Sequence, residues 1–135
     1  MSNVTYTLEL GQHLNLNRKM HWRKKAAIAA VIRSQAARQQ WDLRAQLGRA
    51  HCTAVLTFRD RTRRDPANWA PTVKPAVDGI VSGWPVAVRG WVGLLPDDDS
   101  THLIGPDLRI GAPDSTLPPG HIRLLLDFCE IGGAE

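Results

Sequence analysis

The stretch AHCTAVLTFRDRTRRDPANW, from Ala50 to Trp69, changes character in its middle. Its first nine residues are mostly apolar and include several β-branched side chains, which is typical of a buried strand. Four arginines follow within six residues, and the basic turn ends at the pair Asp65-Pro66. The stretch therefore predicts a strand over residues 50–58 that leads into a basic turn and then into a helix.

The segments on either side complete the pattern. Residues 4–10 alternate apolar and polar side chains, which predicts a half-buried strand. Residues 23–47 are rich in Ala, Arg and Gln and predict a long helix, and a shorter helix is predicted to end at about residue 82. Strands are predicted within residues 101–111 and 121–131. The order β-α-β-α-β-β predicts an α+β domain with a mixed sheet and both helices on one face.

The apolar stripe of the long helix is predicted to consist of Ala27, Val31, Ala37 and Trp41, because these residues can share one face. Glycine commonly follows the last residue of a helix, so Gly48 is a candidate for its end.

The start of the second helix is open at this stage. Asn68 and Thr72 are both capable of capping it. Pro71 and Pro75 are compatible with a helix only in or near its first turn, because proline has no N–H to donate. Gly83 is predicted to stop the helix.

The length of 135 residues is typical of one domain, predicted here as residues 1–135. The amino-terminal sequence lacks the features of a signal peptide, and no segment approaches the roughly 20 apolar residues of a membrane span. A cytoplasmic protein without membrane association is therefore expected. Cys52 and Cys129 lie in apolar stretches without metal-site spacing, so buried, reduced thiols are favoured over a disulfide or metal pair.

The net charge of +4 hides an asymmetry. Residues 1–64 carry 13 Lys and Arg against three acidic residues, whereas residues 65–135 carry four against ten. A basic surface of this kind suits a polyanion such as nucleic acid, although solvated cations on helix faces are the alternative.

The acidic half contains the run LLPDDDSTH, Leu94 to His102, with three consecutive aspartates. Crowded carboxylates repel one another unless a hard cation lies between them, and oxygen ligands suit Mg2+ or Mn2+. The connection after the second helix is long enough to return this run to Asp65 at the helix start. The alternative is a solvated acidic turn capped by Ser100.

The ordered series LNLNRKMHW, RRDPANW, KPAVDGIV and LLPDDDSTHLIGPDLRIG resembles the RusA family of Holliday junction resolvases, particularly its phage and prophage versions. The match covers nearly the whole chain. The resemblance implies a small α+β domain that acts as a homodimer and cuts four-way DNA junctions with Mg2+, Mn2+ being the possible substitute, and with no small-molecule cofactor. It also implies a bacterial cell or a phage-infected host.

The resemblance implies catalytic roles for Asp65, Lys74, Asp98 and Asp99, with Asp99 the principal member of the late acidic pair. The three aspartates among them are the implied metal ligands. The family pattern usually has a second Asp two residues after the first, where this chain has Ala67, which cannot bind a metal. Compensating oxygen ligands could come from Asp97, Asp78 or Asn68. Lys74 and Asp78 also have the spacing of an ordinary exposed helix pair.

Further residues are predicted to contact DNA or its unpaired bases. The predicted phosphate contacts lie in the basic turn and before and within the first helix, and they are Arg59, Arg61, Arg63, Arg64, Arg18, Lys19, Arg23 and Lys24. Core packing is favoured for Trp69, Trp84 and Trp91, and stacking on unpaired bases is the alternative. His102, three residues after Asp99, is the histidine placed best to act at the acidic site.

The sequence therefore predicts a Mg2+-dependent, structure-selective endodeoxyribonuclease that resolves Holliday junctions in recombination and repair. The alternative is a branched-DNA-binding protein of the same fold in which Ala67 has weakened or abolished catalysis. A third hypothesis is a metal-dependent nuclease that acts on flaps, forks or RNA.

Overall fold

A computed structural model describes residues 2–83 and 93–132. The elements within these residues are β1 (Asn3–Leu10), α1 (Trp22–Leu43), β2 (Ala50–Thr57), the 3-10 helix η1 (Pro66–Trp69), α2 (Ala70–Ser82), β3 (Leu103–Ile110) and β4 (Ile122–Glu130). The predicted order of strands and helices is confirmed. Neither helix combines the length and apolar character needed to cross a bilayer.

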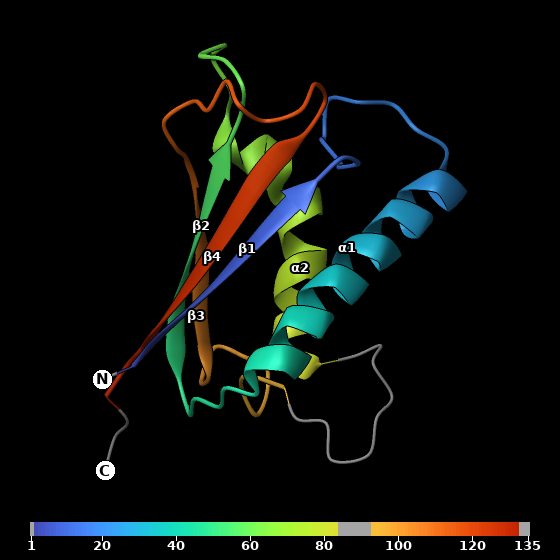
Figure 1. The fold of residues 1–135 in the computed structure, drawn as a ribbon. Coiled ribbons are helices and arrows are strands. Elements are labelled where there is room, and N and C mark those ends of the chain that lie inside the picture. Colours follow the sequence, from blue (N-terminus) through green and yellow to red (C-terminus); the bar gives the residue numbers. More distant parts are fainter. Residues whose placement is uncertain (1, 84–92, 133–135) are drawn as a thin grey trace.

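The four strands form one mixed sheet in the order β1-β4-β2-β3. β4 pairs antiparallel with both β1 and β2, whereas β3 pairs parallel with β2. A parallel neighbour requires a crossover connection, and α2 lies in the one between β2 and β3. Both helices cover the same face of the sheet (Figure 1). The structure therefore confirms a single α+β domain with a mixed sheet.

The core lies between this sheet face and the helices. Alternate residues of β1, β2 and β4 are buried, so the apolar side of each strand faces the helices and the other side faces outward. Tyr6 is fully buried, its hydroxyl donates to the Gln40 side chain of α1, and its ring packs edge-on against Phe128. Burial raises the pKa of the Tyr6 hydroxyl.

The predicted stripe of α1 was partly wrong. Ala37 is buried as predicted, but Ala27 is exposed and Val31 is 59% exposed. The helix instead buries Ile28 and Ile32, which lie one residue further along. A shift of one residue rotates the buried face by about 100°. The helix turns its larger apolar side chains to the core, because they bury more apolar area.

The end of α1 was also predicted wrongly. The helix ends at Leu43, and Arg44 adopts the left-handed conformation with φ 52° and donates its N–H to the Gln40 carbonyl. The Gln40 side-chain amide then donates to the Ala45 carbonyl. The helix therefore ends five residues before Gly48, and Gln40 holds its last turn.

The start of the second helical segment lies earlier than either predicted cap. Asp65 caps η1, since its side chain accepts from the N–H of Ala67, and α2 follows directly. Thr72 is fully buried and exchanges two hydrogen bonds with the backbone of Leu14, so its hydroxyl fastens the loop after β1 to α2. Pro75 lies inside the helix rather than in its first turn.

The cysteines lie on opposite faces of the sheet. Cys52 is buried in the core, which raises the pKa of its thiol to about 12. Cys129 is half-buried on the outward face, so its prediction as a core residue was wrong. Both thiols are free, as expected.

β3 forms one edge of the sheet, and its pairing with β2 is interrupted. The register shifts between His51 and Thr53, opposite Gly105-Pro106. Gly105 has a positive φ of 92°, and a Cβ atom there would lie 2.6 Å from the Cys52 carbonyl oxygen, so glycine is required. Beyond the shift, Asp107 is 2.7 Å from His51 Nε2 on the outward face.

The two helices approach each other closely at Gly79. A Cβ atom at this position would lie 2.3 Å from the backbone oxygen of Arg33 in α1. No side chain fits such a gap without displacement of one helix. Gly79 therefore sets the distance between α1 and α2.

Replacement of Gly79 by alanine should destabilise the protein. In an exposed helix interior, alanine normally raises the free energy of unfolding by about 1 kcal/mol relative to glycine. At Gly79 the clash with Arg33 should instead lower the free energy of unfolding by about 1–3 kcal/mol. Urea unfolding of Gly79→Ala measures this change. Gly48→Ala is the matched control, because a Cβ atom at Gly48 meets nothing within 4 Å. Equal stability of the two variants would contradict the close approach.

Candidate functional site

A pocket of about 310 Å3 lies between α2 and β3, and we call it the α2–β3 pocket. Its apolar wall includes Val73 and Val77 of α2 and Leu108 of β3. Its polar side chains are Lys74, Asp78 and Asp98. The pocket therefore brings α2 together with the acidic run and the edge strand β3, which come later in the sequence.

Lys74 and Asp78 lie one turn apart on α2. Lys74 Nζ is 3.4 Å from Asp78 Oδ1, and the two side chains are 74% and 31% exposed. They form the ordinary helix pair that their spacing predicted, and they also line the pocket. Lys74 can therefore move its ammonium group toward an anion, whereas Asp78 is more enclosed.

The acidic run is positioned by the two leucines before it. Leu94 and Leu95 are buried, and the Leu94 backbone donates to Ile80 of α2 and accepts from Leu47. These contacts anchor the loop against the end of α2. Asp98 then lines the same pocket as Lys74 and Asp78.

The three aspartates have different surroundings. Asp97 accepts from the N–H of Asp98 at 2.7 Å. Asp99 accepts from the backbone N–H groups of Thr101 and His102 and lies 2.7 Å from His102 Nδ1. Asp97 and Asp99 thus organise the turn, whereas Asp98 is the member of the run that lines the pocket.

The hydrogen bond from the His102 side chain is the main cause that lowers the pKa of Asp99. The backbone N–H groups of His102 and Thr101 act in the same direction. These donors stabilise the charged carboxylate more than the neutral acid. His102 therefore acts on the acidic run, but through Asp99.

Asp65 occupies a different place from the rest of the predicted site. It caps η1 at the amino-terminal end of α2, and Ala67 beside it is exposed. Asp65 is not part of the pocket lining, although Ala70, the first residue of α2, is. Asn68 is half-buried in the same short helix. The acidic run was expected to return to Asp65 at the helix start, but it shares its pocket with Lys74 and Asp78 of α2.

The fit to Mg2+ depends on the donors in the pocket. Across residues 2–83 and 93–132, no three His, Cys, Asp or Glu side chains are grouped so as to hold a metal ion. Mg2+ usually keeps several waters and is bound through one or two carboxylates plus substrate phosphate. Asp78 and Asp98 supply two carboxylates beside open volume, so the residues present fit that mode of binding.

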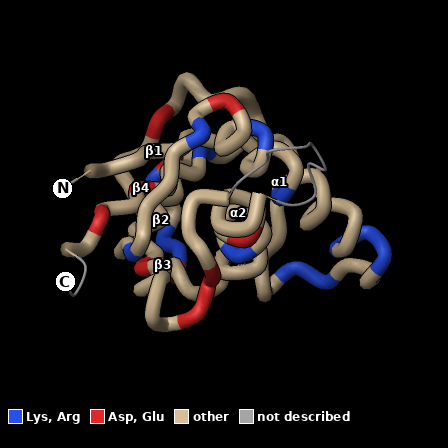
Figure 2. The backbone as a smooth tube through the Cα atoms, turned by 90° about the horizontal axis from the view of Figure 1, so that it is seen from below, with Lys and Arg blue, Asp and Glu red and all other residues tan. Residues whose placement is uncertain are grey.

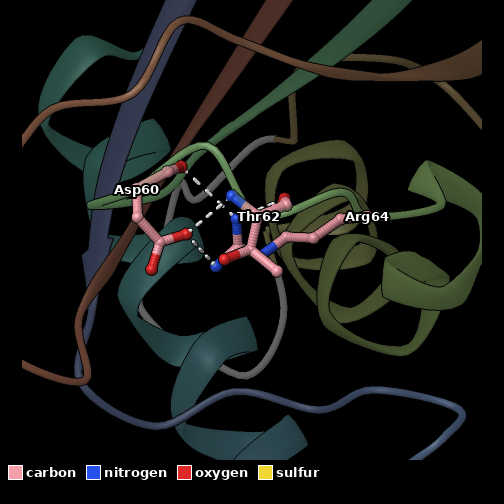
Figure 3. A network of polar contacts seen from close by, with 3 residues as sticks. All are labelled: Asp60, Thr62 and Arg64. Carbon is pink, nitrogen blue, oxygen red and sulfur yellow. Dashed lines mark hydrogen bonds and ion pairs between the residues drawn. The ribbon is translucent and has the colours of Figure 1, made fainter.

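The basic turn after β2 is internally braced by one of its arginines (Figure 3). Arg64 pairs with Asp60 at 2.9 Å, donates to the Thr62 carbonyl, and places its guanidinium 3.9 Å from the centre of the Phe58 ring. The N–H of Thr62 is the main cause that lowers the pKa of Asp60. Arg64 thus shapes the turn that presents three exposed arginines, which are Arg59, Arg61 and Arg63.

A second group of cations lies where the chain enters α1, at the far right of Figure 2. Its exposed members include the predicted DNA contacts Arg18, Lys19, Arg23 and Lys24. The N–H of Leu16 donates to the Asn68 carbonyl at 2.9 Å, which joins this loop to η1. The two basic segments are therefore connected through the start of α2.

The tryptophans can be compared with their two predicted roles, core packing and base stacking. Trp69 is only 7% exposed and packs against Phe58 and His13, so core packing is confirmed for it. Trp84 and Trp91 lie outside the described residues. Trp22 was missed, although it is 67% exposed. The signal was an aromatic residue enclosed by cations in RKMHWRKK, residues 18–25.

No family model matches the chain, and no curated protein matches it. The likeness to RusA resolvases consequently remains a prediction from the motifs.

The pair Asp99 and His102 gives a test of the turn. His102→Ala should raise the pKa of Asp99 toward its ordinary value of 3.8, because the main stabilising donor is lost. Because the folded-state pKa is lowered, the contribution of Asp99 to stability is present above about pH 4 and is lost as the pH falls. A carboxyl NMR titration measures the shift. His51→Ala is the control, since His51 pairs with Asp107 instead, and an unchanged Asp99 titration in His102→Ala would contradict the geometry.

Proposed function

We propose that this protein is a Mg2+-dependent endodeoxyribonuclease of the RusA type that resolves four-way DNA junctions. The observation that carries the proposal is the meeting of Lys74, Asp78 and Asp98 in the α2–β3 pocket. Two carboxylates and an ammonium group in one concave site suit the hydrolysis of a phosphodiester. The exposed arginines of the basic turn add attraction for a polyanion.

Asp78 and Asp98 are the pocket residues that would hold the metal. Mg2+ bound there would polarise the phosphodiester and lower the pKa of an attacking water. Lys74, with its long and largely exposed side chain, would hold a phosphate oxygen of the substrate. The apolar wall of Val73, Val77 and Leu108 excludes water on one side, which strengthens these electrostatic interactions.

The exposed cations would position the DNA backbone. Arg59, Arg61 and Arg63 extend from the basic turn, and the loop before α1 adds Arg18 and Lys19. Such contacts fix the register of a duplex without reading its bases, which suits selection by structure rather than by sequence. The α2 axis runs about 12 Å from Ala70 to Asp78, so one duplex arm can cover both the start of α2 and the pocket.

A four-way junction has approximate two-fold symmetry, so two opposed strands require two equivalent sites. A symmetric homodimer would supply two such pockets. The proposal includes this dimer and a cytoplasmic location in a bacterial or phage-infected cell, where the DNA substrate occurs.

Removal of one pocket carboxylate gives the first test. Asp98→Asn should lower the rate of junction cleavage in Mg2+ by about 100-fold or more, because the variant loses a charged metal ligand at the reacting phosphate. Binding of the junction without metal should persist. Cleavage of a fluorescently labelled junction under single-turnover conditions measures the effect, with Asp42→Asn on the exposed surface of α1 as the matched control.

A folded, dimeric wild-type protein that leaves the junction uncut in both Mg2+ and Mn2+ would refute the proposal. A parallel panel of flaps, forks and RNA would separate junction resolution from a broader nuclease activity.

The second candidate function is a branched-DNA-binding protein with weak or lost catalysis. It is favoured by Ala67, which is exposed beside the Asp65 cap where the RusA pattern has a metal-binding Asp. The two candidates differ in what an added carboxylate would do at this position.

Ala67→Asp provides that comparison. If the wild type binds junctions but cuts them slowly or not at all, the new carboxylate should raise metal-dependent cutting by about tenfold or more, because the RusA pattern has a metal-binding Asp at this position. Ala67 is exposed, so the substitution should leave the fold intact. Ala30→Asp on the exposed side of α1 controls for the added charge. Rapid cleavage by the wild type would eliminate this candidate.

A further inference from the structure

Trp22, the first residue of α1, is exposed to an unusual degree for a tryptophan. Its exposed fraction is 67%, although burial of an indole gains much more than burial of most side chains. It has no part in the hydrophobic core cluster. The packing of the monomer therefore gives no reason for an indole at this position.

The indole is held by its neighbours along the chain. The His21 ring stacks on Trp22 with centroids 5.7 Å apart and an angle of 27° between the planes, and the Arg23 guanidinium lies 5.3 Å from the indole centre. His21 is itself fixed, because its Nδ1 accepts from the N–H of Arg23 and its carbonyl accepts from Lys25. The aromatic surface is thus pre-organised rather than loosely attached.

The surroundings of Trp22 are strongly cationic. The exposed cations on either side of it are Arg18, Lys19, Arg23, Lys24 and Lys25. The sequence has no acidic residue between Glu9 and Asp42, so nothing in this segment offsets their charge. Aromatic side chains that stack with bases, surrounded by cations that hold phosphates, are the combination used to bind single-stranded nucleic acid.

An anionic membrane is a less suitable partner for this surface. A helix that lies in a membrane interface presents a continuous apolar face along its length. One turn after Trp22 lie Lys25 and Ala26, and the next exposed apolar residues of α1 are Ala27, Ala30 and Val31, so the apolar neighbours of the indole on this helix are small. A planar base with a phosphate on each side matches that arrangement better than acyl chains do.

We propose that Trp22, together with the exposed cations of residues 18–25, is a stacking site for an unpaired base of a nucleic-acid strand. This role rests on the proposed function in one respect, because a branched DNA supplies the unstacked bases at its branch point. The Leu16–Asn68 hydrogen bond joins this segment to the start of α2, so a strand held at Trp22 would approach the α2–β3 pocket from the end that carries Asp65. The site itself requires no metal.

The test compares three fluorescent DNA probes in EDTA, which prevents cleavage. Loss of one stacked base costs about 1–3 kcal/mol, so Trp22→Ala should weaken binding of a single strand of about 20 nucleotides and of a four-way junction by roughly 5- to 150-fold. Affinity for a duplex of the same length should change much less. Trp22→Phe should restore most of the affinity, because phenylalanine retains an aromatic face.

Val31→Ala is the matched control, since Val31 is an apolar residue of α1 that is 59% exposed. Circular dichroism of each variant reports whether it is folded. A second readout is 2-aminopurine in the single strand, whose fluorescence should fall on binding to the wild type and to Trp22→Phe, and fall less with Trp22→Ala.

Unchanged single-strand affinity in Trp22→Ala would overturn the inference, as would an equal loss of duplex affinity. Binding to anionic vesicles that depends on Trp22, without any effect on DNA, would overturn it in favour of a membrane. A protein that fails to cut junctions but binds single strands through Trp22 would refute the proposed nuclease and leave this site established.

Discussion

The contact between the backbones of α1 and α2 at Gly79 constrains most of what surrounds the candidate site. It brings the Arg33 carbonyl against α2 and leaves no room for a side chain. As a result α2 is buried along most of its circumference, and the positions that reach solvent fall mainly at every fourth residue, namely Ala70, Lys74, Asp78 and Ser82. Three of these four line the α2–β3 pocket. Polar side chains on α2 can reach the pocket or solvent mainly at these positions. Asp78 directly precedes Gly79, whose close contact with α1 buries the rest of the helix.

The order of strands and helices could be predicted from local patterns. In strands with one buried face, apolar and polar residues alternate, and glycine, proline and charged turns separate the strands from the helices. The buried face of α1 could not be predicted from local patterns. Alanines on several sides of the helix made the Ala27–Val31 and Ile28–Ile32 stripes similar in the sequence. Only packing against the sheet distinguishes them. The end of α1 was missed for a related reason, because it depends on hydrogen bonds of the buried Gln40 rather than on the nearest glycine.

The candidate site shows the same division between local and long-range information. The helical spacing of Lys74 and Asp78 predicted their ion pair correctly. The resemblance grouped Asp98 with Asp99 and made Asp99 the principal member. The structure instead places Asp98 at the pocket, because backbone N–H groups and His102 engage Asp97 and Asp99. The exposure of Trp22 could not be predicted, because it depends on which face of α1 is buried.

The interrupted edge at Gly105-Pro106 affects how molecules of this protein meet at high concentration. An uninterrupted edge strand offers a row of free N–H and C=O groups to which a strand of another molecule can add, and this is a common route to aggregation. In β3 the register shift breaks that row, Pro106 has no N–H to give, and the charged Asp107 and Arg109 follow. Growth of the sheet from one molecule to the next is therefore disfavoured along β3, and the edge that borders the pocket stays accessible to other ligands.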